Sequence, residues 1–174
     1  FNANGEIDYQ KEDLINILLE LRHSISRVYE YYEIGLTQPV ASSLYSPTAD
    51  DMLFFYYVDD SFMRLYSAWN RIANLLSWLF RITKRGEKVY FDRTIEKLRK
   101  IVGEDDAFKR LLAYKDGDYK DIINRRRKEV VHNITSWSTY FKQIVESHSD
   151  EEAIRELTDD RNSIPGFLGE SYKS

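Results

Sequence analysis

The stretch Phe62–Phe80, FMRLYSAWNRIANLLSWLF, decides the fold class. Its large apolar residues recur at steps of three and four, namely at Phe62, Leu65, Trp69, Ile72, Leu76 and Phe80. This spacing aligns them along one side of an α-helix. We predict one long helix from Pro47 and the capping residue Thr48 to about Ile82, closed by the basic residues and glycine of Lys84-Arg85-Gly86.

Helical periodicity continues on both sides of this segment. Further helices are expected over residues 8–33, 92–102, 107–113 and 150–157. Residues 35–46, with Pro39 and several small side chains, are expected to form a loop. The tail from Thr158, which contains Pro165, Gly166 and Gly169, is expected to be a mobile or partner-docked extension.

A last long helix is predicted from Tyr119 to about Glu146. Seven positions spaced alternately by four and three residues form its seam: Ile123, Arg127, Val130, Ile134, Trp137, Phe141 and Ile144. Such spacing is typical of a helix that packs along one face. Six of the seven residues are apolar, and Arg127 is the exception.

Composition agrees with an all-α protein. The 174 residues are 43% hydrophobic and 31% charged, with three prolines and seven glycines. This balance suits one domain, residues 1–174, with a core and few turns. We therefore predict an antiparallel up-and-down bundle of four to five long helices, with a C-terminal extension at 158–174. The absence of cysteine excludes disulfides, zinc–thiolate sites and thiol catalysis.

Charge is unevenly distributed along the chain. The net charge is −4, yet residues 109–128 hold eight basic side chains against three acidic ones. No apolar stretch is both long enough and free enough of charged residues to be a transmembrane helix. We expect a cytoplasmic protein that has no contact with a membrane.

Arg127 and His132 are the candidate catalytic residues. A guanidinium is costly to bury, so Arg127 must reach solvent at the bundle edge, pair with a carboxylate, or line a polar cleft. His132 lies about 140° around an ideal helix from Arg127. The two side chains could converge across a wide groove, at a distorted helix start, or at a two-fold interface between copies.

A metal site is the competing interpretation. Glu20–His23 and Glu129–His132 both have the Glu-x-x-His spacing of di-iron helical bundles. Both pairs lie away from the apolar side of their helices, so they are expected to face solvent. We therefore expect no metal and no cofactor. Asp59 and Asp60 are adjacent and should point apart, and one of them is a candidate buried partner for an arginine.

The last long helix resembles that of the HEPN superfamily, the "higher eukaryotes and prokaryotes nucleotide-binding" domains. The motif Arg-x-x-x-x-His reads Arg127-Lys128-Glu129-Val130-Val131-His132, and residues 60–76 resemble the long helix of a bacterial branch of uncharacterised HEPN proteins. The resemblance covers about 47–145. It implies a homodimer whose facing motif helices form one cleft. Active members of the superfamily are metal-independent RNases, often in toxin–antitoxin or antiviral systems.

The resemblance also implies roles for individual residues. His132 would act as the acid or base, and Arg127 would hold the scissile phosphate. Arg125, Arg126 and Lys128 would bind the RNA backbone. An antitoxin or regulatory protein is a further implied partner. Many members carry a small polar residue where this chain has Lys128, so a catalytically inactive dimerisation or interaction module is the alternative.

Overall fold

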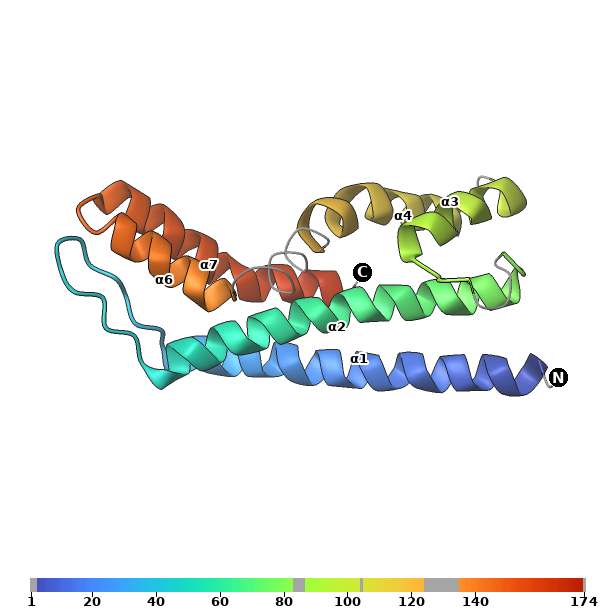
Figure 1. Ribbon diagram of the computed structural model, residues 1–174, viewed down its shortest axis with the longest axis horizontal. Helices are drawn as coiled ribbons and strands as arrows, with labels where there is room; N and C mark the ends of the chain where they lie inside the picture. The colour runs from blue at the N-terminus through green and yellow to red at the C-terminus, as the bar shows by residue number, and fades with distance from the viewer. Residues whose placement is uncertain (1–2, 83–86, 104, 124–134, 174) are drawn as a thin grey trace. The chain divides into compact units, whose positions relative to one another are not determined.

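The protein is all-α throughout the part of the chain that the computed structural model describes, residues 3–82, 87–103, 105–123 and 135–173. Its helices are α1 (Ala3–Ile34), α2 (Ala49–Leu79), α3 (Phe91–Val102), α4 (Asp106–Tyr114), the π-helical segment η1 (Lys115–Ile123), α6 (Ser136–Glu146) and α7 (Glu151–Lys173) (Figure 1). These ranges contain no β-strand. The predicted all-α fold is confirmed for these ranges.

The described helices fall into two compact units. The first contains α1 up to Glu20, α2 from Arg64, α3, α4 and η1. The second contains α1 from Leu21, the α1–α2 loop, α2 up to Met63, α6 and α7. Both long helices therefore contribute to both units.

In the first unit, α1 and α2 run antiparallel and α3, α4 and η1 add an aromatic core. Ion pairs join Asp13 to Arg71 and Glu20 to Arg64, so residue numbers rise along one helix as they fall along the other. The Trp69 ring stacks on Tyr114 with ring centroids 4.1 Å apart and lies 4.8 Å from Phe91. Phe91 is fully buried. Stacked and tilted rings at these separations stabilise the unit beyond their apolar burial.

In the second unit, α1 and α2 are again antiparallel and are covered by α6 and α7. The apolar core combines residues from every element: Leu21, Val28, Phe54, Phe55, Val58, Phe62, Tyr140, Ile144, Ile154, Ile164 and Leu168. Stacking of Phe62 on Phe167, with centroids 6.0 Å apart, links α2 to α7. The α6 helix packs on α2 through Tyr140 and Phe55, 5.0 Å apart.

The buried face of α2 turns as it proceeds toward the C-terminus. Phe62, Leu65 and Trp69 are buried as predicted, but the face then continues through Ala73 and Ser77 in place of Ile72, Leu76 and Phe80. The buried positions Leu65, Trp69, Ala73 and Ser77 recur every four residues, whereas an α-helix has 3.6 residues per turn. The buried face therefore moves around α2 toward its C-terminus and leaves the predicted positions at Ile72, Leu76 and Phe80.

The end of α2 also differs from the prediction. The helix ends at Leu79, and Arg81 has a positive φ of 52°. Backbone bonds run from Ile82 N–H to Ser77 C=O (3.0 Å) and from Arg81 N–H to Trp78 C=O (3.4 Å). These are the two bonds of a Schellman motif. The left-handed closing residue is thus Arg81, and the predicted closing segment 84–86 lies outside the described residues.

The prediction of one unbroken helix over 119–146 is wrong. Thr135 has an extended ψ of 153° and is the N-cap of α6, where its hydroxyl accepts a hydrogen bond from Ser138 N–H. Ser136 N–H donates to the carboxylate of Asp59. Because side chains satisfy the first N–H groups, α6 begins here as a separate helix.

The predicted end of the last helix at Leu157 is also wrong. The α7 helix continues to Lys173 through Pro165, Gly166 and Gly169, and it buries Ile164, Pro165 and Leu168. At Gly169 a Cβ atom would lie 2.6 Å from the Tyr29 hydroxyl, so the glycine permits close approach of α7 to α1. Burial of this apolar stripe outweighs the low helix propensity of proline and glycine.

Candidate functional site

The predicted catalytic residues lie outside the part of the chain that the structure describes. This holds for Arg127 and His132 and for the predicted RNA-binding residues Arg125, Arg126 and Lys128. The described chain ends at Ile123 and resumes at Thr135. The roles of these five residues therefore stay predictions. The described residues before and after this segment show how the neighbouring helices are held.

Asp59 anchors the start of α6. Its side chain lies on α2, is 9% exposed, and accepts a hydrogen bond from Ser136 N–H at 3.2 Å. A carboxylate at a helix N-terminus is stabilised by the unpaired N–H groups and by the helix dipole. Nearby, the Trp137 ring lies 5.8 Å from Phe55. The segment that begins three residues after His132 is thus attached to α2 through the buried carboxylate of Asp59.

Asp60 points to a different element. The Ser24 hydroxyl of α1 donates a hydrogen bond to its Oδ2 atom. The two adjacent aspartates therefore reach α6 and α1 respectively, which confirms that they point apart. That one of them is the buried partner of an arginine stays a prediction.

Asp51 organises the start of α2. Its carboxylate is 1% exposed and accepts hydrogen bonds from the backbone N–H groups of Thr37 (2.9 Å) and Thr48 (2.7 Å) and from both threonine hydroxyls. Thr48 in turn accepts from Asp51 N–H, so the two residues form a reciprocal cap. Burial alone would raise the pKa of Asp51, but these four hydrogen bonds outweigh it and lower the pKa.

Among the described residues of the second unit, Arg161 is a buried arginine, which sequence reasoning missed because the tail is expected to be mobile. It is 2% exposed, and its guanidinium donates to Thr37 C=O (2.9 Å) and to Gln38 Oε1 (3.3 Å). It also lies over the Tyr140 ring, 5.5 Å from the centroid. The backbone of Thr37 thus contacts two buried charged residues. Its N–H donates to Asp51, and its C=O accepts from Arg161.

Two tyrosines complete this buried polar cluster. Tyr45 and Tyr140 are 8% and 6% exposed, and their rings meet edge-on at 6.2 Å. Burial raises the pKa of both hydroxyls, and Asp51 adds to the effect. The cluster ties the α1–α2 loop to α6 and α7, and it can hold this loop in one conformation.

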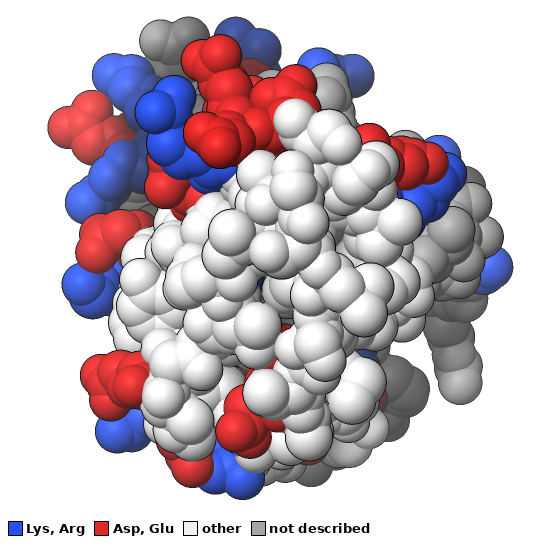
Figure 2. All heavy atoms as spheres, turned by 90° about the vertical axis from the view of Figure 1, so that its left-hand side faces the viewer, with Lys and Arg blue, Asp and Glu red and all other residues white. Residues whose placement is uncertain are grey.

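The anchored loop presents an uncharged surface. Residues 34–49 contain no charged side chain, and Figure 2 shows a broad face without Lys, Arg, Asp or Glu on this side of the molecule. Leu44 is 94% exposed and Val40 61%. They border a hollow of about 420 Å³ that also contacts Ile144, Val145 and Ile154. Exposed apolar surface of this kind is typical of contact sites for other proteins.

The metal interpretation gains no support in the described part of the chain. Glu20 and His23 are both exposed, as predicted, and Glu20 forms an ion pair with Arg64. No group of three metal-ligating side chains occurs among the described residues. Within the same ranges, every helix is too short or too polar to cross a bilayer.

Comparison with known proteins agrees with this architecture. The model of a HEPN-like domain family matches residues 9–171, which is most of the chain. The chain therefore belongs to this HEPN-like family. The match extends well beyond residues 47–145, on which the sequence resemblance was based. No curated protein and no solved structure matches the chain.

Proposed function

We propose that this protein is a metal-independent endoribonuclease that acts as a homodimer. The observation that carries the proposal is the Arg127…His132 motif in a chain that belongs to the HEPN-like family. HEPN domains are typically RNases.

The proposed chemistry needs only protein groups. Cleavage by the ribose 2′-oxygen forms a bond from that oxygen to phosphorus and breaks the bond from phosphorus to the 5′-oxygen. His132 takes the 2′-proton, since an unperturbed imidazole titrates near neutral pH, and the leaving 5′-oxygen takes up a proton from water. Arg127 binds the phosphate oxygens and stabilises their charge in the transition state. The products are a 2′,3′-cyclic phosphate and a 5′-hydroxyl end.

The homodimer is part of the proposal because of helix geometry. On a straight helix Arg127 and His132 project about 140° apart, so a site made from one copy would not gather them. A two-fold axis brings Arg127 of one copy toward His132 of the other. Arg125, Arg126 and Lys128 would then attract the RNA backbone, with an affinity that falls as salt rises.

The experiment is cleavage of single-stranded RNA in the presence of EDTA. Wild-type protein should cut the RNA to 2′,3′-cyclic phosphate ends, and His132→Ala and Arg127→Ala should not. His148→Ala is the matched control, because His148 is an exposed histidine in the turn after α6. Intact RNA with wild-type protein, or equal cleavage by His132→Ala, would refute the nuclease proposal. A monomer in light scattering at micromolar concentration would refute the homodimer.

A second candidate is a catalytically inactive interaction module. The observation that favours it is the uncharged face around Leu44, because such a surface suits a protein partner, either a second copy or a regulatory protein such as an antitoxin. This candidate predicts a stable complex and no cleavage, so the same assay separates the two functions.

A further inference from the structure

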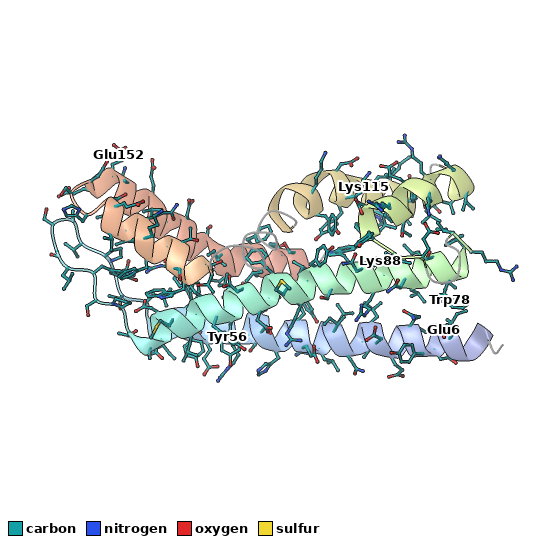
Figure 3. All side chains as sticks on the ribbon, in the orientation of Figure 1. Glu6, Tyr56, Trp78, Lys88, Lys115 and Glu152 are labelled. Carbon is teal, nitrogen blue, oxygen red and sulfur yellow. The ribbon has the colours of Figure 1, made fainter. Side chains whose placement is uncertain are left out.

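The exposed side of α1 and α2 in the second unit carries an ordered group of aromatic rings around one arginine. We call it the tyrosine–arginine surface, and its members are His23, Arg27, Tyr31, Tyr56 and Tyr57. His23, Arg27 and Tyr31 follow one another at steps of four along α1, so they share one side of that helix. The two other tyrosines come from α2, where Tyr56 is labelled in Figure 3.

Arg27 holds the centre of this surface in place. The Tyr31 and Tyr57 rings stack nearly parallel, with an interplanar angle of 14° and centroids 5.8 Å apart. The guanidinium carbon of Arg27 lies 5.5 Å from the first ring and 5.6 Å from the second. Glu30 forms an ion pair with the same guanidinium. The planar groups are thus positioned before any ligand arrives, which lowers the entropy cost of binding.

Tyr56 extends the surface into solvent. It is 62% exposed and meets Tyr57 edge-on, with centroids 5.1 Å apart. His23 also meets Tyr57 edge-on, at 6.4 Å. A tyrosine ring left largely in water adds little to the core, but its face is open for stacking.

The charges of this region suit a planar, anionic ligand. Arg27 supplies the positive charge of this surface, and His23 is exposed one turn before it on α1. The nearby carboxylates have internal contacts, because Glu30 binds Arg27 and Asp60 accepts from the Ser24 hydroxyl. Nucleobases stack on aromatic rings and on guanidinium planes, and the phosphates of the RNA backbone bind arginine.

We propose that the tyrosine–arginine surface binds unpaired bases of single-stranded RNA, with Tyr56 as the stacking ring and Arg27 as the phosphate contact. The inference rests on the proposed RNA function and adds a binding surface outside the motif. It makes unpaired RNA the preferred substrate class, since bases inside a duplex cannot stack on a protein ring.

The test is fluorescence anisotropy with a fluorescein-labelled oligouridine of about 12 nucleotides, within the site sizes of single-strand binders. The full chain carries His132→Ala so that the probe stays intact. Tyr56→Ala should weaken binding roughly tenfold, as expected for loss of one stacked base. Tyr56→Phe keeps the ring and should bind like the parent. Tyr9→Ala is the matched control, because Tyr9 is 64% exposed on α1 within the first unit.

A second probe separates stacking from charge. An abasic oligonucleotide of equal length should bind more weakly, and Tyr56→Ala should leave that weaker binding unchanged. Arg27→Ala should weaken both probes. Equal loss of affinity for both probes in Tyr56→Ala would overturn the stacking role.

The outcomes distinguish this surface from the nuclease. Unchanged oligouridine affinity in Tyr56→Ala overturns the surface, whatever the cleavage assay shows. Tyr56-dependent binding in a wild-type protein that does not cleave RNA supports the surface and refutes the nuclease. Unchanged affinity together with a lower mass in light scattering would show a protein contact at Tyr56 and would overturn the RNA site.

Discussion

Replacement of Arg161 by methionine tests the buried polar cluster directly. Methionine keeps the apolar stem, so the substitution removes the charge and its contacts while losing little volume. The lost contacts include the hydrogen bonds to Thr37 C=O, Gln38 Oε1 and Asn162 Oδ1 and the position over the Tyr140 ring. The substitution also removes the charged hydrogen-bond donor of Thr37 C=O, a carbonyl group inside the protein.

The expected cost follows from these contacts. A charged hydrogen bond contributes about 1.5–3 kcal/mol, and an arginine over a desolvated ring contributes about 0.5–2 kcal/mol. Relief from the desolvation of the guanidinium offsets part of the sum. We expect a net loss of about 3 kcal/mol in the free energy of unfolding. At about 2–4 °C per kcal/mol for a chain of this size, the Tm should fall by about 6–12 °C.

The assay is thermal and urea unfolding followed by far-UV circular dichroism. The matched control is Arg155→Met, because Arg155 lies on the same helix and its side chain is 70% exposed in an ion pair with Glu152. Exposed pairs of this kind contribute about 0–1 kcal/mol, so the control should unfold close to wild type. Equal Tm values for Arg161→Met, Arg155→Met and wild type would refute the reasoning.

Two further predictions concern α7 and the cap of α2. Gly166→Ala should raise the free energy of unfolding by about 0.5–1 kcal/mol, because Gly166 is inside α7 and a Cβ there meets nothing within 4 Å; no gain in urea unfolding would argue against helix at this position. The lowered pKa of Asp51 means that its ionisation stabilises the fold above the unfolded pKa of about 4 and that this contribution is lost as the pH falls below it. Asp51→Asn should therefore lose less stability than wild type between about pH 5 and pH 2 in urea titrations, whereas parallel pH profiles would show that Asp51 is not the group responsible.

Local patterns located most of the helices. The α3 helix matches its predicted range within a residue, and Asp105 caps α4 through the N–H groups of Ala107 and Phe108. Thr48 begins α2 as a capping residue, as predicted. These features depend on hydrogen bonds and side chains within about one turn, so a short window of sequence contains the information.

The errors arose where distant residues decide the local structure. Thr135 could have remained inside a helix, but the buried carboxylate of Asp59, 76 positions earlier in the chain, binds the first turn of a new helix. The tail with Pro165 has poor local propensity, yet burial of Leu168 and Ile164 makes it helical. The candidate catalytic pair was found from its spacing and the family resemblance, and its geometry stays a prediction.

By itself, the sequence determined that this protein is all-α and where most helices lie, and its Arg127…His132 spacing predicts a HEPN-type motif. The spacing of apolar residues locates the helices because an α-helix has 3.6 residues per turn, so residues three and four positions apart share one side. Only the tertiary structure decided that Arg161 is buried against Thr37, 124 positions away, and that Tyr31 stacks on Tyr57 beside Arg27. Such contacts depend on which helix faces pack together, and no local pattern specifies that choice.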